Sequence, residues 1–181
     1  MITWLHLSDW HQHGNEFDRK VVRDALVRDI KTRVSINPNL ANLDFFFFTG
    51  DLANFGIEAE YNAAQTEFLE PVRKATGVPI ERGFIIPGNH DIDRGSFELL
   101  PAGLLEPLAD DAAAQKWLTA GKMRDRLLST FEAYDKFVAG YGAKGFVSFG
   151  GSCTIDVRGT NVGIVGCNSA LMCGRNKQKE G

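Results

Sequence analysis

The sequence contains few histidines, and most of them lie close together near its start. Of the four histidines in 181 residues, three fall within HLSDWHQH at residues 6–13, the fourth is His90, and none follows it. The three cysteines, Cys153, Cys167 and Cys173, are odd in number and lack the paired spacing of a structural zinc site. We therefore expect small buried thiols in a reducing compartment, rather than disulfides or a thiolate-bound metal.

Long apolar runs and an excess of positive charge are also missing. The densest apolar run, LDFFFF at residues 43–48, is far too short to span a bilayer, and no signal peptide follows Met1. The formal net charge of −3 gives no general attraction to nucleic acid or to an anionic membrane. The composition, 44% hydrophobic and 24% charged, predicts one soluble domain over residues 1–181, which we place in the cytoplasm.

The first half alternates short apolar runs with longer segments of helical periodicity. Strands are predicted at residues 2–7, 44–48 and 83–86. One helix is predicted from a cap at Asn15 to a stop at Asn37-Pro38, and a second over residues 57–76, where Pro71 is expected to kink or split it. This β-α-β-α-β order predicts an α/β fold with a parallel sheet and right-handed crossovers.

The second half has a different pattern. Residues 94–145 predict a helical, cap-like insertion, followed by strands at 147–149, 153–157 and 162–167 with glycine-rich turns between them. Loops of the insertion would lie beside the site and help to select the substrate.

Polar side chains follow each of the three predicted parallel strands. The three loops read SDWHQHG, TGDLAN and PGNHDID, and they offer carboxylates, an amide and imidazoles. Ligands bind at the carboxyl ends of parallel strands, and this donor set suits Mn²⁺, Fe or Zn²⁺. In an extended segment, Asp9 and His11 would point the same way. Gly50 and Gly88 permit a sharp exit from the strand and a close backbone approach.

The order DxH, GD and GNHD resembles the calcineurin-like metallophosphoesterase superfamily over roughly residues 1–95. The wider phrases HLSDWH, TGDLANFG and PGNHD are similar to the branch that contains class III cyclic-nucleotide phosphodiesterases, and the DNA-repair nucleases of the superfamily open in a similar way. The resemblance implies a four-layer α/β/β/α sandwich, of which this chain would be the N-terminal portion. It also implies two divalent ions and hydrolysis of a phosphate ester, most simply a phosphodiester, by attack of a hydroxide held between the ions.

The resemblance implies a role for each matched residue. Asp9 and His11 would bind one ion, Asp51 would bridge both, and Asn89 would bind the second through its amide oxygen. His90 would face the substrate and protonate the departing oxygen, and Asp91 would orient His90 by accepting a hydrogen bond.

The neighbours of these residues are expected to be structural. His6 would be buried beneath the loop, His13 solvated, and Asn54 the cap of the next helix. Asn168 follows a predicted strand and has no assigned role.

The sequence departs from the superfamily after residue 90, where a further histidine and a Gly-His-x-His pair would complete both metal spheres. We favour a portion of a longer phosphoesterase, with additional domains beyond residue 181. There are two alternatives. The chain is a degenerate module that binds or regulates, or a second chain supplies the missing ligands. Four side chains divided between two ions predict weak binding of at least one ion and little turnover from this chain alone. The expected partner is a small phosphate ester or nucleotide, with nucleic acid less favoured and no membrane.

Overall fold

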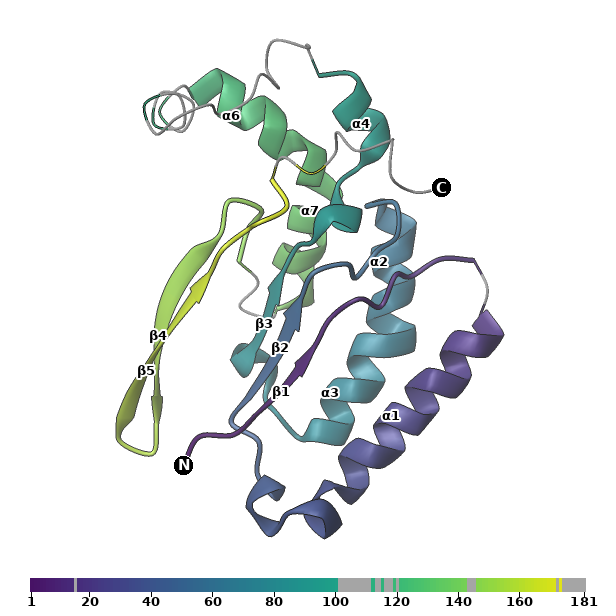
Figure 1. Ribbon diagram of the computed structural model, residues 1–181, viewed down its shortest axis with the longest axis vertical. Helices are drawn as coiled ribbons and strands as arrows, with labels where there is room; N and C mark the ends of the chain where they lie inside the picture. The colour runs from purple at the N-terminus through teal and green to yellow at the C-terminus, as the bar shows by residue number, and fades with distance from the viewer. Residues whose placement is uncertain are drawn as a thin grey trace.

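The computed structural model describes residues 1–14, 16–100, 121–142 and 146–171, and the single positions 112, 115, 119 and 173. Its centre is a parallel sheet in the order β1-β2-β3, and beside it stands an antiparallel hairpin of β4 and β5 (Figure 1). The strands are β1 (Trp4–Leu7), β2 (Phe45–Thr49), β3 (Gly83–Ile86), β4 (Gly151–Val157) and β5 (Thr160–Gly166). The predicted α/β fold with a parallel sheet is confirmed.

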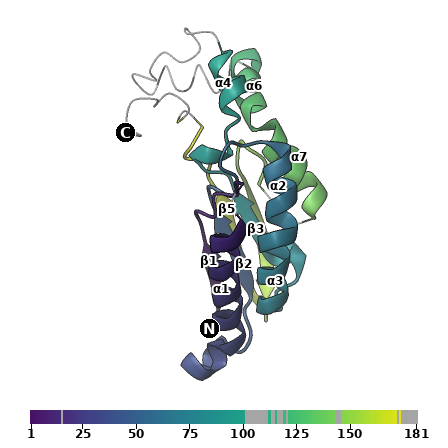
Figure 2. The ribbon, with the colours of Figure 1, turned by 90° about the vertical axis from the view of Figure 1, so that its right-hand side faces the viewer.

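Helices connect the parallel strands and continue after them. They are α1 (Glu16–Ile36), α2 (Glu58–Ala64), the π-helical η2 (Gln65–Leu69), α3 (Glu70–Thr76), α4 (Arg94–Glu98), α6 (Gly121–Leu128) and α7 (Glu132–Tyr141), with short 3₁₀ turns at η1 (Pro38–Leu40), η3 (Ile80–Arg82), η4 (Asn89–Asp91) and η6 (Ser129–Phe131). Figure 2 shows α2, α3 and α7 together on one side of the sheet. In the described residues, no helix is both long and apolar enough to cross a membrane.

The phenylalanines of β2 divide between the two faces of the sheet, as the two-residue period of a strand requires. Phe46 and Phe48 are buried in the core formed with the helices, whereas Phe45 and the half-buried Phe47 face the hairpin side with Phe84. Residues on both faces are packed, which confirms that this strand has no solvent face.

The helix predicted over residues 57–76 is continuous but not regular. Tyr61, Ala64, Phe68 and Val72, which share one face at helical spacing, are buried, and the helix ends at Gly77 in a left-handed conformation. The π-helical segment lies directly before Pro71, which sits in the first turn of α3. Because proline donates no backbone hydrogen bond, the local change of helical pitch accommodates it without splitting the helix.

An ion pair anchors the hairpin to the sheet. The guanidinium of Arg158, at the β4–β5 turn, bonds both carboxylate oxygens of Asp44 at 2.6 and 2.9 Å. Asp44 is 4% exposed and also accepts bonds from the backbone and hydroxyl of Thr3. Hydrogen bonding from Arg158 holds the pKa of Asp44 below its usual value.

Several local expectations are wrong. Residues 147–149 form a turn and not a strand. Cys167 and Cys173 are exposed and Cys153 is half-buried, so none of the three thiols is a fully buried core group. The apolar residues spaced along 17–34 at helical intervals favour a buried stripe on α1, but Phe17 and Val21 are exposed; the helix packs mainly against α3. The cap at Asn15 and most of residues 101–120 lie outside the described residues.

Candidate metal centre

Backbone hydrogen bonds extend the sheet beyond the ends of its strands and bring the three loops together. Asp9 N–H donates to the Gly50 carbonyl at 3.1 Å, and Gly50 N–H donates to the Ile86 carbonyl at 2.9 Å. One step further, His11 N–H donates to the carbonyl of Asp51 at 2.9 Å. The loop after β1 therefore runs beside the loop after β2, which in turn contacts the loop after β3.

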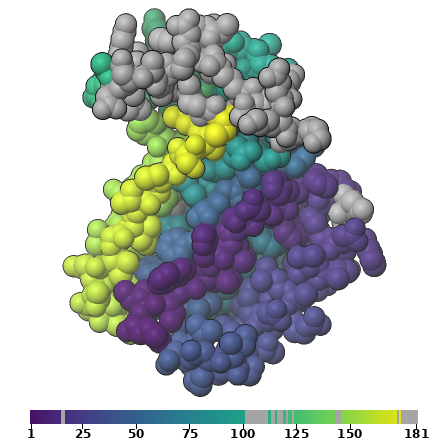
Figure 3. Space-filling model, viewed as in Figure 1, coloured from purple at the N-terminus to yellow at the C-terminus, as the bar shows by residue number. Residues whose placement is uncertain are grey.

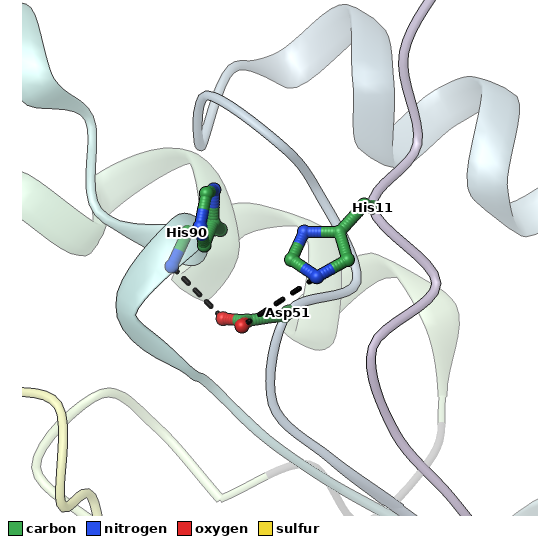
Figure 4. Close-up of side chains that lie close together, drawn as sticks. All are labelled: His11, Asp51 and His90. Carbon is green, nitrogen blue, oxygen red and sulfur yellow. Dashed lines mark hydrogen bonds and ion pairs between the residues drawn. The ribbon is translucent and has the colours of Figure 1, made fainter. Parts of the chain in front are cut away.

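Two of the expected metal ligands, His11 and Asp51, lie side by side at this point, and His90 stands next to them (Figure 4). His11 Nε2 lies 3.7 Å from Asp9 Oδ1 and 3.9 Å from Asp51 Oδ2. Two ligands placed about 2.1 Å from one ion lie roughly 3–4 Å apart, so these separations suit donors that share a cation. Donor atoms of His11, Asp51 and His90 also lie within 4.8 Å of one another.

A cavity of about 480 Å³ opens beside these donors. Asp9, Asp51 and Asn89 line its polar end, and Phe47 and Phe84 are among the apolar residues that line the rest. Figure 3 shows this hollowed face between the purple segment after β1 and the yellow end of β5. The Asn89 side chain is exposed, so its amide is accessible from the cavity.

The orientation of His90 comes from a backbone carbonyl rather than from Asp91. Its Nδ1 lies 3.0 Å from the carbonyl oxygen of Asn54, which leaves Nε2 on the other side of the ring. The ring stands edge-on to that of His11, with centroids 4.6 Å apart. Donor atoms of His90, His11 and Asp51 lie close enough together to share a cation, so His90 is a candidate ligand, and its substrate-facing role stays a prediction.

Asp91 has a different role from the predicted one. Its side chain is fully buried and accepts bonds from the backbone N–H groups of residues 51, 52, 53 and 88 at 2.9–3.3 Å, and from the Tyr61 hydroxyl at 2.9 Å. Burial raises the pKa of the Asp91 carboxyl, although these hydrogen bonds lower it in part. Asp91 is therefore a clamp that fixes the loop after β2 to the loop after β3.

Three of the converging residues have left-handed backbone conformations. The φ angles are +60° at Asp9, +49° at His11 and +59° at Asp51. The expectation of an extended Asp9-Trp10-His11 segment is therefore wrong, although both side chains still point to one place. Aspartate and histidine tolerate this conformation better than most residues, which is consistent with their positions here.

The two glycines behave as expected. Gly50 has a φ of +95°, and a Cβ on Gly88 would overlap the Asp51 carboxylate and lie 2.6 Å from the Asp51 nitrogen. The loops after β2 and β3 can approach this closely only with glycine at position 88.

The neighbouring polar residues are mostly structural. His6 is exposed, contrary to expectation, and its Nε2 lies 2.6 Å from the Thr49 hydroxyl. His13 is exposed, as expected. Helix α2 is capped at Ile57 and not at Asn54, which instead contributes its carbonyl to His90. Asn168 donates from Nδ2 to the Ser148 carbonyl and accepts a bond from the Ala170 N–H, and so joins its own turn to the turn at Ser148.

Sequence reasoning missed two groups that support the site. Tyr61 was assigned only to the core, but a buried tyrosine hydroxyl needs a partner, and that requirement was the available signal. Gln12 was also missed: it accepts a bond from Trp10 Nε1 at 2.6 Å and donates to Glu67 at 3.1 Å. Gln12 thereby ties the middle of the DxH loop to the π-helical segment.

The donor chemistry fits a divalent cation. The His11 imidazole lies 3.7–3.9 Å from one carboxylate oxygen of Asp9 and one of Asp51, and Asn89 lines the same cavity as both aspartates. Oxygen and imidazole nitrogen donors of this kind suit Mn²⁺, Fe and Zn²⁺ alike.

Comparison with known proteins agrees with the geometry. The sequence profile of the calcineurin-like phosphoesterases matches residues 2–161, so the chain belongs to the calcineurin-like phosphoesterase family. It is 32% identical over 93 residues to a Bacillus subtilis (strain 168) protein named "Uncharacterized metallophosphoesterase-like protein YydB". That match covers 51% of this chain and 18% of the relative, so the chain spans a small part of the relative's length.

Proposed function

We propose that this chain carries the N-terminal half of a dinuclear metal-dependent phosphoesterase site whose substrate is a small phosphodiester. The observation that carries the proposal is the position of His11 Nε2, which lies 3.7 Å from Asp9 Oδ1 and 3.9 Å from Asp51 Oδ2 beyond the ends of two parallel strands. In this proposal Asp9 and His11 hold one ion, Asp51 bridges to a second, and Asn89 binds the second through its amide oxygen.

Bound divalent ions of this kind supply Lewis-acid stabilisation of phosphoryl oxygens and lower the pKa of water. The remaining chemistry belongs to His90. With Nδ1–H donated to the Asn54 carbonyl, a protonated ring can give up its Nε2 proton to the departing oxygen. Asp91 keeps His90 in place indirectly, because it fixes the loop that carries the imidazole.

The cavity favours a small ester. Its volume of about 480 Å³ falls in the range of about 300–1,000 Å³ that is usual for small-molecule sites. Apolar residues line the part of the cavity away from the donors, which suits the organic groups of a diester or nucleotide. The net charge of −3 makes a long nucleic-acid substrate the less favoured choice.

A non-catalytic module that binds or regulates is the second candidate. The exposure of Asp9, whose side chain is 66% accessible, favours this candidate. A dinuclear site needs more donors around its ions than the described residues supply. The two candidates agree on metal binding and differ in turnover.

Both candidates predict metal binding. Titration of the metal-free protein with Mn²⁺, monitored by electron paramagnetic resonance of the free ion, tests this prediction. We expect Asp51→Asn to weaken Mn²⁺ binding at least about tenfold. Asp29→Asn, which makes the same chemical change at an exposed position on α1, should leave Mn²⁺ binding unchanged. Absence of Mn²⁺ binding by the wild-type chain would refute both candidates.

Hydrolysis assays separate the two candidates. With Mn²⁺ present, we expect slow cleavage of bis(4-nitrophenyl) phosphate and slower cleavage of the monoester 4-nitrophenyl phosphate. His90→Asn should remove this turnover yet retain Mn²⁺ binding. Binding of Mn²⁺ without turnover by the wild type would favour the module, and preference for the monoester would refute the diester assignment.

A further inference from the structure

A second pocket lies behind the loop that carries Asp9 and His11. It has a volume of about 230 Å³ and is lined by Trp10, Arg19, Lys20, Arg23 and Glu67. It shares no lining residue with the cavity beside the metal centre. Three of its five lining side chains are cationic and one is anionic, so the pocket has an excess of positive charge.

Within the part of the chain that the structure describes, one edge of the Arg19 guanidinium has no hydrogen-bond partner. Nη1 donates to the His11 carbonyl at 3.3 Å, but Nε and Nη2 are buried and make no hydrogen bond. These two nitrogens form the side-on edge of the guanidinium, whose parallel N–H groups match the two oxygens of a carboxylate or phosphate. Buried donors without an acceptor are unfavourable, and an unassigned ion is one of their recognised explanations.

Another arginine of this chain shows the same edge with a partner in place. Arg73 Nε and Nη2 each bond one carboxylate oxygen of Glu70, at 3.2 and 2.9 Å. Arg19 is one of the residues that line the pocket, and no oxygen pair of the described residues meets its buried Nε and Nη2.

The other charged side chains of the pocket either make hydrogen bonds within the protein or are exposed to solvent. Arg23 donates through Nη1 to the Glu67 carbonyl and through Nε and Nη2 to Asp24. Glu67 accepts a bond from Gln12 at 3.1 Å, and Lys20 is exposed. The remaining wall is rigid, since Trp10 stacks on Phe68 with centroids 4.0 Å apart.

We propose that this pocket is a binding site for a phosphate oxyanion, which pairs two of its oxygens with Arg19 Nε and Nη2. The volume lies below the range of about 300–1,000 Å³ usual for drug-sized ligands, which favours inorganic phosphate or the phosphoryl group of a small ester over a whole nucleotide. Because Arg19 bonds the His11 carbonyl, an anion held there would fix the backbone of the metal loop.

Isothermal titration of the protein with inorganic phosphate, after removal of metal ions on a chelating resin, tests the site. We expect saturable binding by the wild type and a loss of at least about tenfold in affinity for Arg19→Gln. Arg19→Lys should also bind more weakly, because lysine keeps the charge but loses the paired donors. Arg28→Gln, an exposed arginine on the same helix, should bind as the wild type does.

Two further arms define the ligand and its place. Asp51→Asn should retain phosphate binding, which would separate this pocket from the metal centre. Methyl phosphate binding as tightly as inorganic phosphate would identify a phosphoryl group as an acceptable source. Failure of the wild type to bind phosphate, equal binding by a folded Arg19→Gln variant, or tighter binding of acetate than of phosphate would overturn the proposal.

Discussion

Replacement of Asp91 by alanine would remove the group that fixes the two loops of the metal centre to each other. The Asp91 carboxylate is fully buried and accepts short bonds from the backbone N–H groups of Asp51, Ala53 and Gly88, at 2.9, 3.0 and 2.9 Å. The Tyr61 hydroxyl donates a fourth at 2.9 Å. Alanine leaves the three backbone donors without a partner in a place that water reaches poorly.

The expected loss of stability follows from those donors. Each buried donor left without an acceptor costs about 1–3 kcal/mol, and relaxation of the loop reduces the sum. Burial raises the pKa of Asp91, so removal of the carboxylate also removes an unfavourable desolvation. We therefore expect Asp91→Ala to lower the free energy of unfolding by about 3–5 kcal/mol, a large part of the 5–15 kcal/mol typical of a domain.

Milder variants keep the test decisive if Asp91→Ala does not fold. Asp91→Asn retains one carbonyl oxygen but turns its NH₂ group toward other donors. It should lower the free energy of unfolding by about 1–3 kcal/mol. Tyr61→Phe removes one hydrogen bond and should cost about 1 kcal/mol. Urea unfolding followed by circular dichroism measures each, with the exposed Asp29→Ala as control. A loss below 1 kcal/mol for Asp91→Ala would refute the clamp, as would an equal loss for the control.

Two other predictions concern the hairpin anchor and the loop contact. Arg158→Gln should lower the free energy of unfolding at neutral pH, because it leaves the buried Asp44 carboxylate without its charged donor. Since Arg158 lowers the pKa of Asp44, this contribution is complete above the unfolded pKa of about 3.9 and is lost as the pH falls through the folded value. Unfolding curves of wild type and variant should therefore converge in acid; a constant difference down to pH 2 would contradict this. Gly88→Ala should lower the free energy of unfolding by about 2–4 kcal/mol and weaken Mn²⁺ binding, because its Cβ overlaps Asp51. Gly163→Ala, with open space around the position, should change neither quantity. A Gly88→Ala variant as stable as wild type would show that the loops separate easily.

The sequence predicted the core of the fold well because its signals were local. β2 follows from a short continuous apolar run and the buried face of residues 57–76 from helical periodicity, and both are confirmed. The strand expected at residues 147–149 failed because three apolar or small residues in a row fit a turn as well as a strand. The apolar stripe of α1 was also misleading, since an edge helix buries less than its pattern suggests.

The site was predictable in its residues but not in its supports. Strand ends placed Asp9, His11 and Asp51 together because parallel strands end at one edge of a sheet. Which group orients His90 depends on the path of the backbone at Asn54, and residue types do not encode that path. Adjacency in sequence suggested Asp91 as the partner of His90, whereas the buried carboxylate points to the opposite loop.

The left-handed residues explain why such a clamp is needed. Asp9, His11 and Asp51 adopt conformations that cost about 1–2 kcal/mol each relative to the common regions, and their own preferences would not hold them there. The loops persist because backbone bonds from Asp9 and His11 to the loop after β2, and from that loop to Asp91, fix them from both sides. The same geometry that turns two carboxylates and an imidazole toward one point therefore depends on groups that contact no ion. It follows that variants of Asp91 should weaken Mn²⁺ binding in proportion to the stability they lose, whereas Asp51→Asn should weaken binding with little loss of stability.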